Sequence, residues 1–296
     1  MQLFRIHIRP QKGITKKNDV FNYCLSHNIL GVGWRLKDFE NTLDWNTYHQ
    51  EAKKTYKDLS RCKYIKNEVK KNDLVWTRDP IGKYYLAKVV SGWEYFTTTE
   101  SWDKNIDIGN VFRVELREVK IDAVPGKVVA CFRATRAIQK IDDGKTLEYS
   151  KFLWNNLTKS QTYLIDYDKF KNIFMMLDDR ETEDIIFIYL QSLGWYVVPN
   201  SRQHDTIHFE YLLVNKVTKE KALVQVKTGN TQINQQNYVK FKEKIFLFQS
   251  NNLYLGQDTE NVISINPKDI LQFIQSSIDW LPQNFQTKFN LISNFN

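Results

Sequence analysis

The chain has 296 residues, of which 42% are hydrophobic and 14% aromatic, and it carries a formal charge of +8 at pH 7. This composition excludes a disordered or low-complexity protein, and the length leaves room for two domains that each bury a core. The positive charge favours a polyanionic partner, because lysines that neutralise phosphates release counterions.

Cysteine use and the first residues predict the cellular compartment. Cys24, Cys62 and Cys131 are odd in number and form no CxxC pair, so neither a disulfide framework nor a zinc site is indicated. Residues 1–10 alternate like a strand and lack the apolar core of a signal peptide, and no apolar stretch approaches membrane-spanning length. We therefore expect a cytoplasmic protein that makes no membrane contact.

The first part of the chain, about residues 1–140, consists mainly of short strand-like segments. After the first strand the pattern predicts a helix at residues 18–27 and, after Trp34, a long basic helix. Further strands are expected at residues 73–79, 84–90, 111–119 and 128–133. Several short strands that close on themselves indicate a small β-barrel with accompanying helices.

The basic segment is the candidate contact to a nucleic-acid backbone. It carries eight Lys and Arg residues between positions 53 and 71, with few acids. The residues expected to contact phosphates are Lys53, Lys57, Arg61 and Lys70. A solvated helical face is the alternative interpretation of such a run.

The segment NDLVWTRDPIGKYYLAKV, preceded by GVGW and followed by GWEY, resembles the PUA-like superfamily, in particular its EVE and YTH members. The resemblance covers roughly residues 4–141 and implies a barrel with an aromatic pocket for a modified or flipped base. Such a pocket needs flat walls for stacking and polar groups for the base edge. We expect walls from Trp34, Trp76 and Trp93, with Trp34 first, and Asp79 or Arg78 at the base edge; a place in the core is the alternative for each Trp.

Little periodicity is visible in residues 140–171, which marks the passage to a second domain. We expect the first domain to span residues 1–145, a linker or packing helix residues 146–180, and the second domain residues 181–296. That domain opens with the amphipathic helix ETEDIIFIYLQSLGW at 181–195, with acids in its first turn, and a strand follows at 195–198.

The next two strand-like segments, residues 207–214 and 223–229, flank a polar turn and are expected to pair as an antiparallel hairpin. Alternate side chains of a strand share a face, so Gln225 and Lys227 project together, and the pairing brings Glu210 opposite Lys227. Oxygen donors of this kind suit Mg²⁺, with Mn²⁺ as the alternative ion, and the lysine can activate water or counter phosphate charge.

The order of acidic helix, strand, acidic strand and QxK strand resembles the PD-(D/E)xK nuclease superfamily, most closely its Mrr-like and archaeal Holliday-junction-resolvase branches. The resemblance covers residues 181–229, with weaker support to residue 274. It implies that Glu183, Glu210 and Gln225 hold the metal ion and that Lys227 is the motif lysine, so that these four are catalytic. Glu210 replaces the usual Asp, and Gln225 is neutral where many members carry a carboxylate.

Two alternatives stay open for this motif. Asp205 is a second candidate for the strand acid, but it lies an odd number of residues from Glu210, so a regular strand would send it to the other face. An ordinary half-exposed strand also accounts for the V-Q-V-K pattern. Beyond the motif we expect a polar helix at residues 235–244, strands at 244–249 and 262–265, and a helix after Asn266 and Pro267. This alternation predicts a restriction-endonuclease-like α/β domain with a central mixed sheet.

The two halves together predict a modification-dependent or base-sensing DNA endonuclease that hydrolyses phosphodiesters with Mg²⁺, as in type IV restriction of phage or foreign DNA. Cutting both strands needs two active sites, so a homodimer is expected, at least on DNA. A non-catalytic RNA- or DNA-binding protein built on a degraded nuclease fold is the alternative that the neutral Gln225 favours. A resolvase acting on branched DNA is the third.

Overall fold

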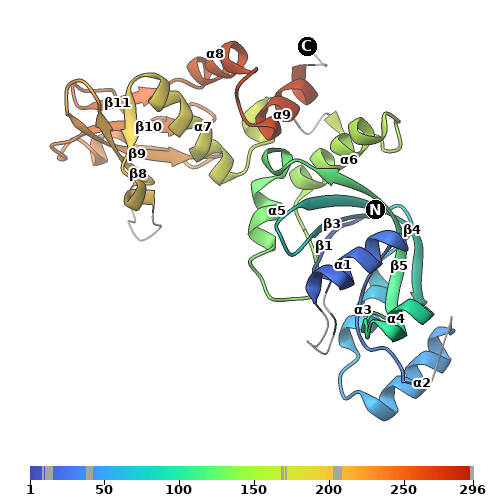
Figure 1. Ribbon diagram of the computed structural model, residues 1–296. Helices are drawn as coiled ribbons and strands as arrows, with labels where there is room; N and C mark the ends of the chain where they lie inside the picture. The colour runs from blue at the N-terminus through green and yellow to red at the C-terminus, as the bar shows by residue number, and fades with distance from the viewer. Residues whose placement is uncertain are drawn as a thin grey trace. The chain divides into compact units, whose positions relative to one another are not determined.

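The computed structural model describes residues 1–8, 10, 16–37, 43–167, 170, 172–202 and 209–293, and the chain divides into two compact units, Met1–Asp166 and Tyr167–Asn296 (Figure 1). Each unit contains one sheet and its own hydrophobic core. The first unit extends beyond the boundary expected near residue 145, because α6 (Gly144–Thr158) packs into it: the Tyr149 hydroxyl donates to the carbonyl of Ala123 at 2.7 Å.

The sheet of the first unit has six strands in the order β2-β5-β4-β3-β1-β6. Their bounds are β1 Leu3–Ile6, β2 Ile29–Val32, β3 Leu74–Arg78, β4 Tyr84–Tyr95, β5 Asn110–Val119 and β6 Ile138–Lys140. β1 runs parallel to β3, and the other neighbouring pairs are antiparallel. β2 and β6 end this order, and no pairing in the described part of the chain joins them, so closure into a barrel is not shown.

Two local predictions for the first unit are wrong. The expected long basic helix is two helices, α2 (Trp45–Thr55) and α3 (Ser60–Glu68), because the chain breaks between them to bury Leu59 in the core. The expected strand at residues 128–133 is instead the helix α5 (Gly126–Cys131), which starts directly after Pro125. The remaining helical segments are α1 (Lys17–Ser26), α4 (Thr99–Asp103) and η1 (Ile121–Ala123).

The second unit has a mixed sheet, as the sequence predicts, in the order β11-β10-β9-β8-β7. Its strands are β7 Trp195–Val197, β8 Tyr211–Asn215, β9 Lys221–Lys227, β10 Lys244–Gln249 and β11 Val262–Ile265. β8 and β9 form the expected antiparallel hairpin, with Tyr211 opposite Val224, whereas β10 runs parallel to both β9 and β11. The helix expected at residues 235–244 is wrong: only the single turn η5 (Gln235–Asn237) forms there.

The two faces of this second sheet are covered differently. On one face α7 (Asp179–Ser192) packs Ile185 and Ile186 into a core with Tyr211 and Val224, joined by α8 (Pro267–Ser277) and α9 (Gln283–Ser293). The other face carries a smaller cluster around Ile245 and Leu247, covered by loop aromatics. Short 3-10 turns, η3 (Ile173–Met175) and η4 (Pro199–Arg202), flank α7 and β7.

A buried ion pair fastens α9 to the start of α7. Lys288 Nζ lies 2.5 Å from Glu181 Oε2, and both side chains are at most 5% exposed. Glu181 also closes a capping box with Asp178, which begins the helix. Among the residues described, no helix combines the length and apolar composition needed to cross a membrane.

Candidate active site and nucleobase pocket

Three polar side chains meet at the open end of the β8–β9 hairpin. The amide nitrogen Nε2 of Gln225 donates to Glu210 Oε1 at 2.6 Å, and Lys227 Nζ lies 3.9 Å from the same oxygen. The backbone N–H of Glu210 donates to the carbonyl of Val224 at 2.8 Å, which extends the strand pairing by one residue. The convergence of Glu210, Gln225 and Lys227 follows from this register and from the alternation of side chains along β9.

The three side chains form a gradient from the interior to solvent. Gln225 is 2% exposed, whereas the side chains of Glu210 and Lys227 are 19% and 40% exposed. An ion pair this open contributes less than about 1 kcal/mol to stability. The ammonium group is therefore accessible to a substrate anion, while the amide forms the floor of the site.

Aromatic side chains border Glu210 on the same face of the sheet. Phe209 contacts Tyr238 and Phe241 edge to face, with ring centroids 5.9 and 5.1 Å apart. Burial, and then the negative charge of Glu210, raise the pKa of Tyr238. The Tyr238 phenol therefore stays protonated at neutral pH and keeps a hydroxyl donor near the carboxylate.

The loop after Lys227 is held by a residue that the sequence did not single out. Gln249, the last residue of β10 and the register partner of Lys227, is fully buried. Its amide nitrogen donates to the carbonyls of Gly229 and Thr231 at 2.8 and 3.0 Å, and its oxygen accepts from two backbone N–H groups. The sequence feature that could have identified Gln249 is its place as a polar residue at the end of the apolar strand KIFLFQ.

The helix acids lie differently from the expectation. α7 covers the face that carries Tyr211 and Val224, and by alternation Gln225 and Lys227 point to the other face. The backbone carbonyl of Glu183 accepts the Tyr211 hydroxyl at 3.3 Å. This contact does not involve the Glu183 carboxylate, whose role as a metal ligand therefore stays a prediction. One carboxylate of α7 contacts the residue that follows the motif lysine: Asp179 Oδ1 accepts from Thr228 Oγ1 at 2.6 Å.

The described residues of this site offer few oxygen ligands for a divalent cation. Asp205, with residues 203–208, lies outside the described part of the chain. Within the described ranges, no group of three or more His, Cys, Asp or Glu side chains gathers closely enough to hold a metal ion. The oxygen ligand at the meeting point is the Glu210 carboxylate, and the Gln225 amide presents its nitrogen to it instead of the oxygen expected from the sequence.

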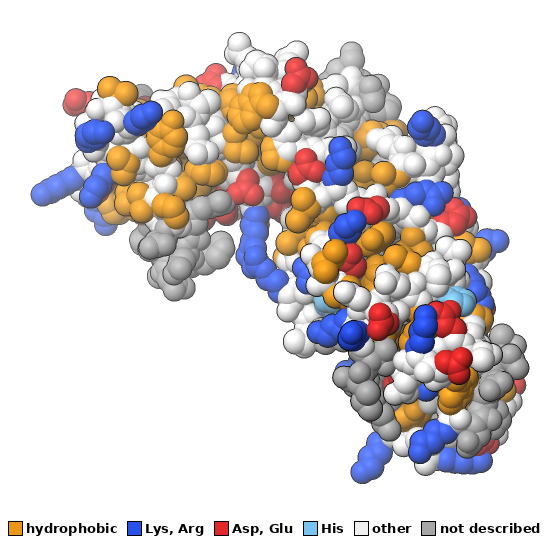
Figure 2. Space-filling view, in the orientation of Figure 1, with side chains coloured by type: hydrophobic (Ala, Val, Ile, Leu, Met, Phe, Trp, Pro, Cys, Tyr) orange, Lys and Arg blue, Asp and Glu red, His pale blue; other side chains and the backbone are white. Residues whose placement is uncertain are grey.

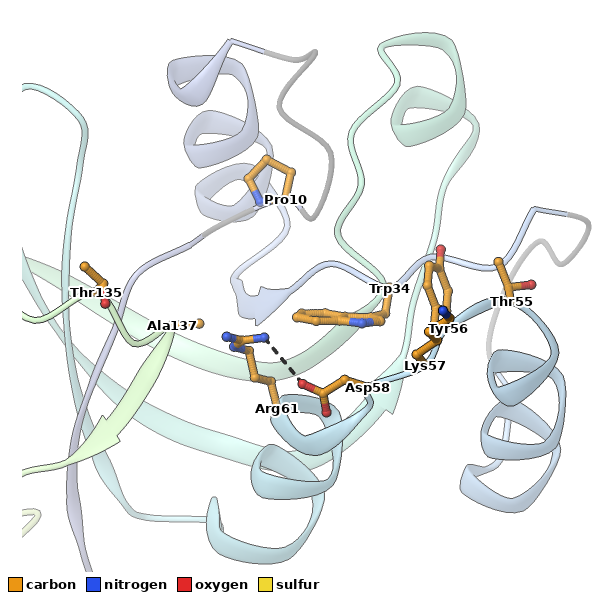
Figure 3. A pocket seen from close by; sticks show the side chains of 9 residues that line it. All are labelled: Pro10, Trp34, Thr55, Tyr56, Lys57, Asp58, Arg61, Thr135 and Ala137. Atoms are coloured by element: carbon orange, nitrogen blue, oxygen red, sulfur yellow. Dashed lines mark ion pairs between the residues drawn. The ribbon is translucent and has the colours of Figure 1, made fainter.

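The first unit contains a cavity of about 620 Å³ with Trp34 in its wall (Figure 3). The Arg61 guanidinium carbon lies 5.5 Å from the Trp34 ring centroid, and Asp58 pairs with Arg61 at 3.9 Å. The other lining residues are Pro10, Thr55, Tyr56, Lys57, Thr135 and Ala137. The cavity thus combines one indole wall with two cations, and its volume is in the usual range for ligand pockets.

Backbone geometry at Trp34 is unusual. Its φ of 65° lies in the left-handed region, which costs a residue with a bulky side chain about 1–3 kcal/mol. The Tyr48 hydroxyl donates to the Trp34 carbonyl at 3.0 Å, and the Tyr95 hydroxyl accepts the N–H of Leu36 at 3.0 Å. These bonds hold the strained turn. Trp34 is only 7% exposed and belongs to the hydrophobic core of the unit, so its indole is a core residue that also borders the cavity.

The structure places the other residues expected at the base pocket away from this cavity. Trp76 is fully buried and its indole N–H donates to Ser150 Oγ at 3.0 Å, so its assignment as a pocket wall is corrected to a core residue. Trp93 is half-buried, stacks edge to face with Trp45 at 4.9 Å and donates to Asn110. Asp79 lines a different cavity.

The predicted backbone contacts are all exposed, but they fall into two groups. Lys57 and Arg61 line the Trp34 cavity, whereas Lys53 and Lys70 lie on α2 and after α3, outside its lining. On the face shown in Figure 2, Lys and Arg side chains occur over both units, interspersed with Asp and Glu. The positive charge is therefore not confined to the segment between residues 53 and 71.

Comparison with known proteins gives little similarity. No family model matches the chain, and no curated protein matches its sequence. Among solved structures, the chain is similar to the DNA modification-dependent restriction endonuclease AspBHI, over 75% of this chain and 68% of that one, at 11% identity and a TM-score of 0.27. At this TM-score the similarity carries no inference about the activity of this chain.

Proposed function

We propose that this protein is a base-sensing, modification-dependent DNA endonuclease that hydrolyses phosphodiester bonds with Mg²⁺, in the manner of type IV restriction. The observation that carries the proposal is the convergence of Glu210, Gln225 and Lys227 at one end of a hairpin, with separations of 2.6 and 3.9 Å. The succession of α7, β7, β8 and β9 along the chain is the helix and strand order on which the sequence resemblance to PD-(D/E)xK nucleases is based.

The donor chemistry fits Mg²⁺ in part. The Glu210 carboxylate is a hard oxygen ligand, and Gln225 offers a carbonyl oxygen once its amide turns about its last side-chain torsion, because its nitrogen now faces Glu210. Glu183 is the remaining ligand of the proposed set and has to reach the ion from α7, which covers the other face of the sheet. Mn²⁺ is the alternative ion. A bound ion of this kind supplies Lewis acidity at the scissile phosphate.

Lys227 carries the electrostatic part of the proposal. Its ammonium is the exposed member of the site, and Glu210 keeps it pointing toward the hairpin end. Negative charge builds on the phosphate oxygens in the transition state, and a fixed cation at that point stabilises the transition state more than the ground state.

The Trp34 cavity carries the base-sensing part. Extruding a base costs a few kcal/mol of stacking, and a ring that stacks on the base offsets that cost. Lys57 and Arg61 line the same cavity and supply charge for the adjoining phosphates. A PUA-like barrel and a homodimer that assembles on DNA belong to this proposal.

Cleavage of modified and unmodified DNA in Mg²⁺ tests the proposal. Lys227→Met and Glu210→Gln should each lower the rate by about 10²–10³-fold, the usual effect of losing one transition-state contact. Lys221→Met is the matched control, because Lys221 is exposed on the same strand and on the same face by alternation. Trp34→Ala should cut both substrates at similar rates. Full activity in Lys227→Met would remove the proposed site.

A specific observation favours a second candidate, a non-catalytic nucleic-acid-binding protein on a degraded nuclease fold. Gln225 already satisfies Glu210 by a 2.6 Å hydrogen bond, which leaves the pair stable without an ion. Calorimetric titration with Mg²⁺ or Mn²⁺ distinguishes the nuclease from the non-catalytic binding protein, because the binding protein should show no saturable binding of the ion. Four-way junction substrates in the cleavage assay would reveal a resolvase.

A further inference from the structure

A second cavity of the first unit, of about 820 Å³, adjoins the Trp34 cavity and shares Pro10 and Thr135 with it. It lies between the start of α1, the turn after β3 and the loop after α5. Neither the sequence motifs nor the proposed base pocket accounts for it.

The lining of this second cavity is strongly basic. Lys16, Lys17 and Arg133 are exposed along its rim, and Arg78 is half-buried in its wall. Asp79 is the acidic residue in the lining, and its Oδ1 accepts the backbone N–H groups of Ile81 and Lys83 at 3.0 and 2.8 Å. The carboxylate is thus engaged in a turn, and the cavity keeps an excess of positive charge.

Arg78 is held in a fixed orientation. Its guanidinium carbon lies 5.3 Å from the ring centroid of Phe132 and 5.6 Å from that of Tyr84, and Nη1 donates to the Tyr84 hydroxyl at 3.3 Å. Among the described residues, no carboxylate lies within ion-pair distance of it. A planar guanidinium fixed by two rings presents its remaining N–H donors as a fork, which matches the geometry of a phosphate.

The wall between the two cavities is also fixed. Arg5, which is fully buried on β1, donates to the carbonyl oxygens of Arg136 and, at 3.5 Å, Ala134. His7 Nε2 lies 3.2 Å from the Ala134 carbonyl oxygen. The segment that both cavities share is therefore tied to the central sheet.

We propose that this second cavity binds a phosphate of the nucleic-acid strand whose base enters the Trp34 cavity, with Arg78 as the phosphate ligand. This assignment rests on the proposed base-sensing function and replaces the role of base-edge reader that the sequence suggested for Arg78. Arg133, Lys16 and Lys17 supply the surrounding positive field. Phosphate contacts fix the register of a strand, so Arg78 would set which nucleotide meets Trp34.

The test is binding of the full chain to short single-stranded DNA, and to duplexes with and without a modified base, in EDTA and at several salt concentrations. Arg78→Gln should weaken binding by the same factor for modified and unmodified DNA and reduce the salt slope by about 0.7 on single strands. Arg133→Gln, at an exposed position, should act in the same direction without a change in folding. Thermal unfolding of each variant checks the fold.

Arg117→Gln is the matched control. Arg117 also carries its guanidinium over an aromatic ring, 5.7 Å from the centroid of Trp154, and its Nη1 donates to the Leu116 carbonyl at 2.7 Å. It lines neither cavity. This variant should keep both the affinity and the salt slope of the wild type.

Three results would overturn the assignment. Equal losses in Arg78→Gln and Arg117→Gln would show a general charge effect, and a changed preference between modified and unmodified bases with an unchanged salt slope would make Arg78 a base-edge reader. A mononucleotide that binds as tightly as the strand would point to a free nucleotide as ligand. If Trp34→Ala bound like the wild type while Arg78→Gln bound weakly, the phosphate site would stand and base sensing would fail.

Discussion

The Glu210–Gln225 contact makes a quantitative prediction for Gln225→Glu, which restores the carboxylate that many PD-(D/E)xK nucleases carry. In the wild type the Gln225 amide donates to Glu210 Oε1 at 2.6 Å in a position that is 2% exposed. The variant places a second carboxyl group against the first. We expect it to destabilise the second unit in the absence of a divalent ion.

The loss of stability depends on which protonation state of the two carboxyl groups has the lower free energy. If both carboxyls ionise, the lost charge-assisted hydrogen bond costs about 1.5–3 kcal/mol, and two charges about 4 Å apart repel by about 4 kcal/mol at an effective dielectric constant near 20. If the new carboxyl stays protonated it donates to Glu210, and holding that proton at pH 7 costs about 4 kcal/mol, since a free Glu has a pKa of about 4.3. The protonated state has the lower free energy, so we expect a destabilisation of about 4 kcal/mol.

The stability of Gln225→Glu should depend on pH. The pKa of the new carboxyl is raised in the folded state, so the folded state binds the proton more tightly than the unfolded state, and stability is lost as the pH rises. Each pH unit from 7 toward 5 should recover about 1.4 kcal/mol. Mg²⁺ or Mn²⁺ should also restore stability, because an ion between the carboxylates replaces the proton.

Urea unfolding followed by circular dichroism at pH 5 and pH 7, with and without Mg²⁺, measures these shifts. Gln225→Met is the control: it loses the hydrogen bond but adds no charge, so its loss of about 1.5–3 kcal/mol should be flat with pH and insensitive to Mg²⁺. A Gln225→Glu variant as stable as the wild type at pH 7 would refute the reasoning, because it would mean that the side chains at positions 210 and 225 do not touch.

Other predictions follow from the same unit. Lys288→Met leaves Glu181 buried without its cation and should lower the unfolding free energy by about 3–5 kcal/mol in urea titrations, whereas a loss below about 1 kcal/mol would contradict the buried pair. Burial, and then the charge of Glu181, raise the pKa of Asp178 above its usual 3.8, so wild-type stability should fall relative to Asp178→Asn as the pH rises from that value; parallel pH profiles would refute this. Gln249→Ala should lower the cleavage rate while Mn²⁺ affinity in calorimetry stays within a few-fold, because Gln249 orders the loop after Lys227 without offering a ligand; an unchanged rate would count against it.

Much of the hairpin site could be predicted from sequence because it depends on local rules. The alternation along residues 223–227 fixes which side chains share a face, and a short polar turn fixes the antiparallel pairing, so Glu210, Gln225 and Lys227 meet as expected. Trp34, which the two nearby glycines singled out, does border a cavity and has a φ of 65°, but it is also a core residue, and its role in base binding stays a prediction.

Other features depend on tertiary contacts that leave no periodic trace. Gln249 reaches the motif loop through a parallel strand whose partner is distant in sequence, and Asp179 meets Thr228 across 49 residues. Trp76 has the same local pattern as a pocket wall, and only the packing of α6 shows that it is core. The two-helix break in the basic segment arises because Leu59 is needed in the core, which overrides the helix-forming lysines around it.

A crystal structure with Mn²⁺ tests the central claim most directly, because anomalous scattering places the ion without assumptions about its ligands. The account predicts an anomalous peak between the Glu210 carboxylate and the Gln225 side-chain oxygen, with that amide turned from its hydrogen bond and Lys227 within reach of a bound phosphate. Protein that cleaves DNA in Mn²⁺ but shows no peak at Glu210, or a peak on other residues, would contradict it.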